Sequence, residues 1–176
     1  MSESGKKVVV LDASAFISGL DPLSISHEQY TPPAVQQELK EKSMATVRLK
    51  MASESGKLKI REANQQFLEK AKESAALVGD AFFLSEADVQ VLALALELKS
   101  QGMSPLIATD DYSIQNVANQ LGIEFASLAT FGIRRRLNWI RYCPACGKKY
   151  PATFSSKSCT VCGTMLKRKA LRKNTA

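Results

Sequence analysis

The chain has 176 residues, of which 45% are hydrophobic, so it is long enough for one ordinary domain and a small additional module. It has no apolar run of about 18 or more residues, the length that crosses a membrane, and its first residues, MSESGKK, include no apolar signal region. We therefore expect a soluble, cytoplasmic protein that is neither secreted nor embedded in a membrane.

The net charge of +7 is divided unevenly along the chain. Residues 1–130 contain 12 Lys or Arg and 17 Asp or Glu, a balance of −5, whereas residues 131–176 contain 12 Lys or Arg and no acid. A stretch of this length without a carboxylate indicates a polyanionic partner such as nucleic acid, although a solubilising tail would carry the same charge. All four cysteines also lie in this stretch, which argues against a disulfide-stabilised secreted fold.

The first strong pattern is VVVL at residues 8–11, which is mostly β-branched and follows two lysines. An unbroken apolar run of this kind is typical of a strand in a parallel sheet, buried on both faces. Asp12 follows at the carboxyl end of the strand, where open α/β sheets bind their ligands, and a short helix then ends at Gly19. Asp12 fits either a functional carboxylate or an ordinary helix N-cap.

Residues 28–60 alternate between short strands and helices. The expected elements are a strand over 28–30, a helix capped by Thr31 that runs to about residue 42, a second helix over 44–57 and an edge strand over 58–60. Glu38 lies beside the apolar face of the first of these helices. Its carboxylate therefore either reaches a cleft or stays in solvent.

Two longer helices follow, over residues 64–78 and 85–102. Ser85 is the expected N-cap of the second, which is the strongest helical pattern in the chain. Asp88, in its first turn, completes the Ser-x-x-Asp pattern of a capping box, where an acid also suits the helix dipole. One carboxylate oxygen is enough for a cap, so Asp88 can cap the helix and serve a site as well.

A second buried strand is expected over residues 106–109, and Asp110 and Asp111 follow it as Asp12 follows the first. After one more helix, a third short buried strand is expected over 123–126. The alternation of strands and helices predicts an α/β fold with right-handed crossovers, and therefore a parallel sheet with helices on both faces.

Two buried strands thus end in acids and two helices carry acids, and all of these should converge at one edge of the sheet. Carboxylates gathered within a few ångströms repel one another, and burial strengthens the repulsion. A divalent cation removes it, and oxygen ligands without His or Cys suit Mg²⁺ or Mn²⁺ rather than zinc. Such a cation activates water and stabilises charge on a phosphoryl group. The alternative is a set of independent helix caps.

The cysteines form two pairs, Cys143-Pro-Ala-Cys146 and Cys159-Thr-Val-Cys162, separated by twelve residues and each followed by glycine. Two such pairs place four thiolates around one zinc ion, and since no position stays open the zinc should be structural. A redox pair would need only one of them, and two disulfides do not suit the expected compartment.

Cations and aromatic residues alternate around the cysteines, as they do on surfaces that hold phosphates and stack on bases. The candidates for RNA contact are Arg134, Arg135, Arg136, Arg141, Lys148, Lys149 and Lys157. Tyr150 and Phe154 fit either base stacking or the small core of the module.

Four motifs, in order, make residues 1–130 similar to PIN domains, a family of small metal-dependent ribonucleases. They are LDASAF with Asp12, PAVQQEL with Glu38, LSEADVQVLALA with Asp88 and IATDDYSIQNVA with Asp111. The resemblance implies that these four acids hold the catalytic Mg²⁺ or Mn²⁺ and that water attacks an RNA phosphodiester. Asp110 is an extra neighbour of the last acid, and Ser14 matches a small hydroxyl position that could touch a metal-bound water.

A PIN domain followed by a four-cysteine zinc ribbon resembles the archaeal form of the Nob (Nin one binding) family over nearly the whole chain. The phrase DDYSIQNV before LGI is close to the last motif of that family. The resemblance implies an endonuclease that matures the 3′ end of small-subunit ribosomal RNA. Its expected partners are precursor rRNA and the pre-ribosomal subunit, with a KH-domain assembly factor as a further candidate.

The expected domains are a PIN-like nuclease over 1–126, a linker over 127–141, a zinc ribbon over 142–166 and a disordered basic tail over 167–176. Two other functions fit the same sequence. One is an RNA-binding assembly factor whose acids no longer catalyse. The other is a toxin-type PIN ribonuclease, a class that usually lacks a ribbon.

Overall fold

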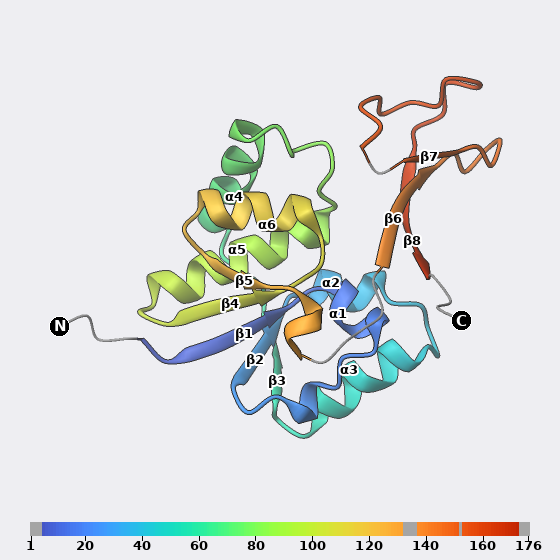
Figure 1. Cartoon of the computed structure of the whole chain (residues 1–176). Coiled ribbons are helices and arrows are strands. Elements are labelled where there is room, and N and C mark those ends of the chain that lie inside the picture. The colour runs from blue at the N-terminus through green and yellow to red at the C-terminus, as the bar shows by residue number, and fades with distance from the viewer. Residues whose placement is uncertain (1–4, 132–136, 152, 173–176) are drawn as a thin grey trace. The chain divides into compact units, whose positions relative to one another are not determined.

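The computed structural model describes residues 5–131, 137–151 and 153–172. The chain divides into two compact units, Met1–Arg134 and Arg135–Ala176 (Figure 1). Within the described residues, no helix combines the length and the apolar character that crossing a membrane requires.

The first unit is built on a five-stranded parallel sheet with strand order β3-β2-β1-β4-β5. Its strands are β1 (Lys7–Leu11), β2 (Glu28–Thr31), β3 (Leu58–Ile60), β4 (Ser104–Ala108) and β5 (Glu124–Ala126). β1 takes the central place because its apolar run is covered on both faces. Val9 pairs with Gln29 of β2 on one side and with Leu106 of β4 on the other.

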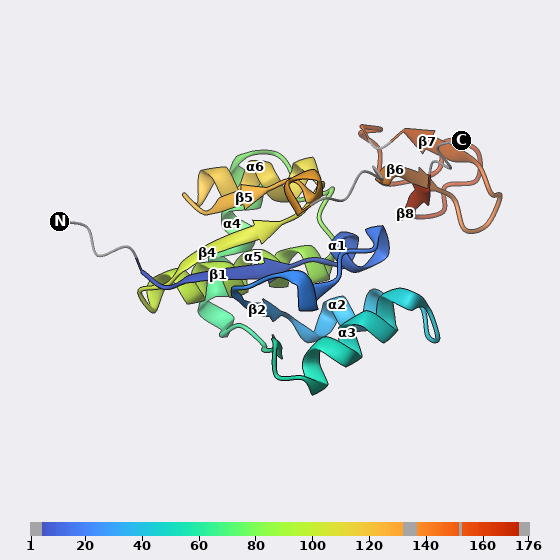
Figure 2. The ribbon, with the colours of Figure 1, turned by 60° about the horizontal axis from the view of Figure 1, so that its bottom comes forward.

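Helices cover both faces of this sheet, as predicted (Figures 1 and 2). They are α1 (Ala13–Ser18), α2 (Pro33–Glu38), α3 (Met44–Glu54), α4 (Gln65–Leu77), α5 (Glu86–Ser100) and α6 (Tyr112–Gln120), with 3-10 turns η1 (Pro22–Ser24) and η2 (Leu128–Phe131). α1 and α3 pack together on one side. On the other side, α5 packs on β1 and β4, and α4 and α6 flank it.

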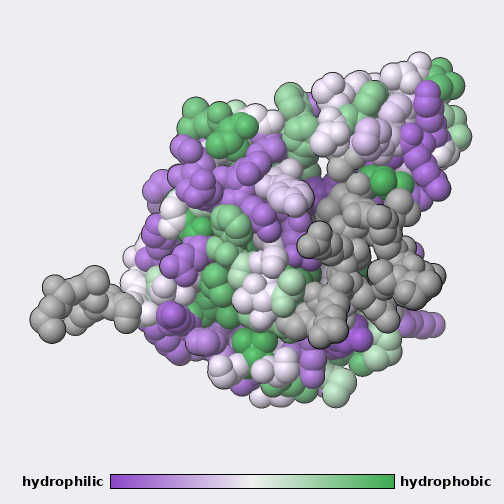
Figure 3. Space-filling view, viewed as in Figure 1, coloured by the Kyte–Doolittle hydropathy of each residue, from purple (hydrophilic) through white to green (hydrophobic). Residues whose placement is uncertain are grey.

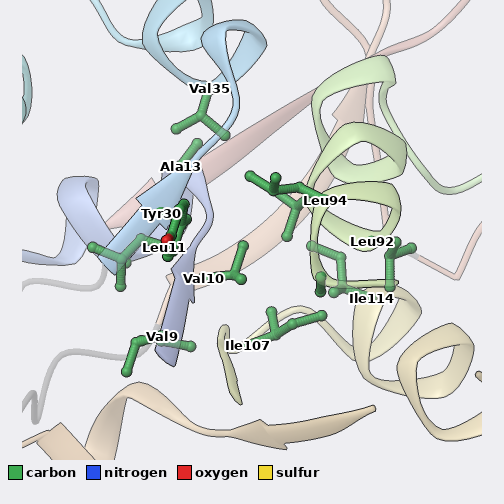
Figure 4. Close-up of a cluster of buried hydrophobic side chains, with 14 of the residues drawn as sticks. Val9, Val10, Leu11, Ala13, Tyr30, Val35, Leu92, Leu94, Ile107 and Ile114 are labelled. Carbon is green, nitrogen blue, oxygen red and sulfur yellow. The ribbon is translucent and has the colours of Figure 1, made fainter. Parts of the chain in front are cut away.

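The main core lies between β1, β4, α5 and α6. Val10, Ile107, Leu94 and Ile114 are all fully buried and point toward one another in Figure 4. α5 is apolar on most of its surface because it lies between the sheet and three other helices, α2, α4 and α6.

One acid inside this core has a structural role that its sequence position does not reveal. Glu97 of α5 is 2% exposed, and its carboxylate accepts hydrogen bonds from the Arg61 side chain and from the backbone N–H of Asn64, at 2.7 Å. Asn64 is the N-cap of α4. Glu97 therefore joins the start of α4 to the last turn of α5.

The structure differs from the local predictions at three places in this unit, the first of which is α2, which ends at Glu38 instead of near residue 42. Thr31 lies at the end of β2 and donates its hydroxyl to the Leu11 carbonyl, at 2.8 Å, so Pro32 takes the N-cap position of α2. β5 is not a buried strand, because it pairs only with β4 at the edge of the sheet and leaves Phe125 39% exposed.

The second unit contains a three-stranded antiparallel sheet with strand order β7-β6-β8. Its strands are β6 (Leu137–Tyr142), β7 (Lys149–Pro151) and β8 (Lys167–Arg172). The boundary between the two units falls inside the stretch predicted as a linker, 127–141, although this stretch also contains η2 and most of β6. The predicted disorder over 167–176 is wrong as far as Arg172, and residues 173–176 lie outside the described residues.

Strand pairing explains why both stretches contain regular structure. β6 and β8 pair over six positions, from Leu137 opposite Arg172 to Tyr142 opposite Lys167, so their backbone groups satisfy one another. The Lys169 ammonium also lies 4.7 Å from the centre of the Tyr142 ring. A run of basic residues looks like a solvated tail in the sequence because its partner strand is distant along the chain.

Candidate functional site

Asp12 is the N-cap of α1 and is only 3% exposed. Its Oδ1 accepts hydrogen bonds from the Ala15 N–H at 3.1 Å and from the Ser14 hydroxyl at 2.5 Å. Its Oδ2 accepts one from the Thr109 hydroxyl, also at 2.5 Å. The capping role is therefore real, and the carboxylate is held in one orientation at the carboxyl end of β1.

Thr109 connects this carboxylate to the next strand. While its hydroxyl donates to Asp12, the same oxygen accepts the backbone N–H of Asp111, at 3.0 Å. Asp111 is 5% exposed and caps α6 by accepting the Ser113 N–H at 2.9 Å. The sequence motifs do not single out Thr109 as a site residue. The one feature that could identify it is a hydroxyl at the very end of a buried strand, directly before two acids.

Burial raises the pKa of Asp12 to about 6 from its ordinary 3.8, although Ser14, Thr109 and Ala15 donate hydrogen bonds that lower it. The negative charge of Asp111 makes a smaller contribution to the same rise. The pocket therefore disfavours the charge of Asp12. A bound cation is the kind of group that would reverse this preference.

Asp88 forms the predicted capping box. Its Oδ2 accepts the Ser85 N–H at 2.7 Å, and its own N–H donates to the Ser85 hydroxyl at 3.2 Å. The side chain is 8% exposed. α5 ends just before β4 begins, and β4 runs parallel to β1, so the first turn of α5 lies at the sheet edge that carries Asp12 and Asp111.

Glu38 is the last residue of α2 and is exposed. Its neighbours in the helix, Val35 and Leu39, are buried, and α2 packs on α1 and α5. The structure does not draw the four acids together around a common point. In the described part of the chain, the four cysteines are the one cluster of three or more ligating side chains close enough to hold an ion.

Asp110 and Asp111 have different surroundings although they are neighbours in sequence. Asp110 is half-buried, and its Oδ1 accepts the backbone N–H of Leu128 at 2.8 Å. Asp110 thus anchors η2, the turn that follows β5, whereas Asp111 faces Thr109 and Asp12.

The four cysteine sulfurs of the second unit lie within 4.8 Å of one another, and none forms a disulfide. The Sγ atoms of Cys143 and Cys162 are 3.3 Å apart, and those of Cys146 and Cys159 are 3.5 Å apart. Sulfurs around a tetrahedral zinc ion are about 3.8 Å apart, given Zn–S bonds of about 2.3 Å. The donor set and its spacing therefore fit zinc.

Hydrogen bonds to sulfur support this cluster. The Cys146 N–H points to the Cys143 Sγ and the Val161 N–H to the Cys159 Sγ, both at 3.4 Å. The Tyr150 hydroxyl lies 3.1 Å from the Cys159 Sγ. This hydroxyl, together with backbone N–H groups, lowers the pKa of Cys159 to about 6, which favours the thiolate that binds metal.

Tyr150 belongs to the small core of the unit, which decides between the two predicted roles. It is 6% exposed and packs with Cys143, Cys159 and Leu166. Its ring centre is 4.4 Å from that of Phe154, at an interplanar angle of 32°. Base stacking by Tyr150 is therefore excluded in this conformation.

The predicted RNA-contact residues divide into three groups. Lys148, Lys149 and Lys157 are exposed. Arg141 is 6% exposed, its Nη1 donates to the Ser156 carbonyl at 3.3 Å, and burial lowers its pKa, so the predicted contact with RNA does not fit its position. The remaining candidates, Arg134, Arg135 and Arg136, lie outside the described residues.

Comparison with known proteins connects these features to nucleases. The family model for the PIN domain of ribonuclease matches residues 9–98. The endoribonuclease Nob1 of Methanocaldococcus jannaschii is 39% identical over 166 residues, which are 94% of this chain and 79% of the relative. Nob1 of Pyrococcus abyssi is 38% identical over 162 residues, 92% of this chain and 93% of the relative. Ribonuclease VapC1 of Thermoplasma acidophilum is 34% identical over 164 residues, 92% of this chain and 77% of the relative.

Proposed function

Since the chain belongs to the PIN-domain family of Nob1 endoribonucleases, we propose that it matures the 3′ end of small-subunit ribosomal RNA by metal-dependent cleavage. One observation carries the catalytic part of this proposal. Asp12 and Asp111 are both buried at the carboxyl ends of the adjacent strands β1 and β4, and Thr109 joins them through its hydroxyl. Ligands of open α/β sheets bind at this edge.

Asp12, Glu38, Asp88 and Asp111 are the residues that would hold Mg²⁺ or Mn²⁺. The proposal is supported by the chemistry of the donors, which are carboxylate oxygens, and by the burial of Asp12, which raises the pKa of its carboxyl and so disfavours a negative charge without a neighbouring cation. A bound ion supplies an activated water and stabilises the charge on the phosphoryl group. The protein holds the Asp12 carboxylate in place through Ser14, Ala15 and Thr109.

The second unit would hold one structural zinc ion through Cys143, Cys146, Cys159 and Cys162. This would leave the exposed lysines of the ribbon to bind RNA phosphates. The substrate would be precursor rRNA within the pre-ribosomal subunit in the cytoplasm, where thiols stay reduced. A KH-domain assembly factor is the further partner that we propose.

The similarity to Ribonuclease VapC1 favours one alternative, a toxin-type ribonuclease that cleaves other RNAs. The inactive assembly factor has less support, because the acidic positions of all four motifs are occupied.

Cleavage mapping distinguishes these functions. The full chain is incubated with precursor small-subunit rRNA and Mn²⁺, beside Asp12→Asn, which keeps the cap because Asn caps a helix about as well as Asp. We expect one cut at the mature 3′ end by the wild type and at least a ~100-fold loss in the variant. Equal products from both proteins would favour the inactive factor with a contaminating nuclease, and preferred cleavage of other RNAs would favour the toxin type.

A further inference from the structure

Two exposed aromatic side chains lie on segments that also supply acids of the proposed site. Tyr112 is the first residue of α6 and directly follows Asp111, yet its side chain is 80% exposed. The next residues of that helix that face the core, Ile114 and Val117, are fully buried. A ring that faces solvent one residue from a buried site carboxylate is not part of the core, so packing does not account for it.

The second aromatic residue is Phe82, in the connection between α4 and α5, and it is 58% exposed. The Asp80 carboxylate in this connection accepts a hydrogen bond from the Asn116 side chain at 3.1 Å. Asn116 lies one turn after Tyr112 on the same face of α6. The connection that carries Phe82 is therefore tied to the face of α6 that carries Tyr112.

The same connection leads directly into the site, since Phe82 precedes Ser85, the cap of α5, by three residues, and Asp88 follows in the first turn. Figure 3 shows hydrophobic residues gathered over the end of α4 and the connection that follows it. Each of the two aromatic residues thus lies on a segment that also supplies an acid of the site.

Charge makes aromatic contacts useful here. Residues 1–130 have a balance of −5, so this part of the chain repels phosphates as a whole. Stacking of a base on an aromatic ring does not depend on charge and tolerates any base, because every base has a π-face. In an RNA duplex the faces of the bases are already stacked on one another, so this contact needs unpaired nucleotides.

We propose that Tyr112 and Phe82 position the substrate by stacking on unpaired bases beside the scissile phosphodiester. This inference rests on the proposed function for the position of the scissile bond. The stacking itself can be measured without cleavage.

The test uses the full chain and a short single-stranded RNA with 2-aminopurine at successive positions, without Mg²⁺ or Mn²⁺. We expect the wild type to quench the fluorescence of one or two of these positions. Tyr112→Ala should remove the quenching at one position and weaken binding by about 5- to 100-fold, whereas Tyr112→Phe should keep both. Phe82→Ala should act on a neighbouring position.

Leu77→Ala is the matched control, because Leu77 ends α4 beside the same connection and is 77% exposed. It should change neither quenching nor affinity. Unchanged quenching and affinity in Tyr112→Ala would overturn the inference, as would an equal loss on fully paired RNA. A loss seen with pre-ribosomal subunits but not with free RNA would also overturn it and indicate a protein contact. None of these outcomes depends on Asp12, so the cleavage test of the proposed function stays separate.

Discussion

The two units of this protein handle charge and stability in opposite ways. The first has an excess of acids, buries several of them against hydroxyls and backbone N–H groups, and rests on a large apolar core. The second has no acid, and among its side chains that the structure describes, the core consists of Cys143, Tyr150 and Cys159 with two half-buried neighbours. So small a core cannot stabilise a fold without additional links. The comparison teaches that, under the proposed function, a metal ion would serve chemistry in the first unit and folding in the second.

The largest expected effect concerns the zinc ribbon. Cys146→Ser removes one of four zinc ligands, and structural zinc contributes on the order of 10 kcal/mol to folding in small zinc domains. We expect the second unit to lose its structure and the first to keep it, because the first unit contributes no ligand. Amide NMR spectra would show loss of the dispersed signals of the second unit, including those of Tyr150 and Cys159, while the signals of the first unit stay unchanged. Freshly purified wild type should contain about one zinc per chain, and elemental analysis without zinc would contradict the assignment.

The next effect concerns RNA affinity. A chain that ends at Thr130 keeps a balance of −5 and loses all 12 basic residues of the remaining segment. Its affinity for RNA should fall by roughly 100- to 1,000-fold at moderate salt, and the dependence on salt should become shallow, since counterion release scales with the phosphates neutralised. Fluorescence anisotropy at several salt concentrations measures both. If the shortened and full chains bind equally, the basic segment is not the main RNA-binding surface.

Variants of the neighbouring acids Asp110 and Asp111 test which of the two carboxylates in the first unit belongs to the metal site. Asp111→Asn should lower cleavage by about 100-fold or more, because it removes a proposed metal ligand. Asp110→Asn should cost less than about 10-fold, since an amide oxygen can still accept the Leu128 N–H. Single-turnover cleavage rates, with melting curves as the control for folding, decide between them. Equal losses in the two variants would assign Asp110 to the site as well.

A smaller effect should appear in stability. The pKa of Asp12 is about 6 in the folded chain and near 3.8 when unfolded, so the folded state disfavours the charged form. The charge of Asp12 therefore lowers the free energy of unfolding. This loss is absent below about pH 4, grows as the pH rises to 6 and reaches its full size of about 3 kcal/mol above pH 6. In a chain ending at Thr130, without divalent ions, Asp12→Asn should therefore be more stable than the parent by ~1–3 kcal/mol at pH 8. Denaturant unfolding at pH 4 and pH 8 tests this. If the difference in the free energy of unfolding between variant and parent is the same at the two pH values, the prediction is wrong.

Features that depend on local chemistry could be predicted from the sequence. The apolar run of β1 predicted a buried central strand, and Ser85 with Asp88 predicted the capping box that is present. The spacing of the cysteines predicted a cluster that brings all four sulfurs together. In each case neighbouring residues determine the structure, so a short stretch of sequence is sufficient.

Features that depend on distant partners could not be predicted in this way. The pairing of β8 with β6 is invisible in a basic run, and the burial of Arg141 follows from its contact with the Ser156 loop. Glu97 looks like any helical glutamate until Arg61 and Asn64 are placed beside it. Thr109 gains its role only because β1 and β4 are neighbours in the sheet.

The central claim, that the acids of the first unit hold a catalytic ion, is tested most directly by Mn²⁺ binding to the zinc-loaded full chain, followed by electron paramagnetic resonance. The wild type should bind one Mn²⁺, and Asp12→Asn should bind it at least ~100-fold more weakly while its zinc content stays the same. Equal Mn²⁺ affinity in the two proteins would contradict the account.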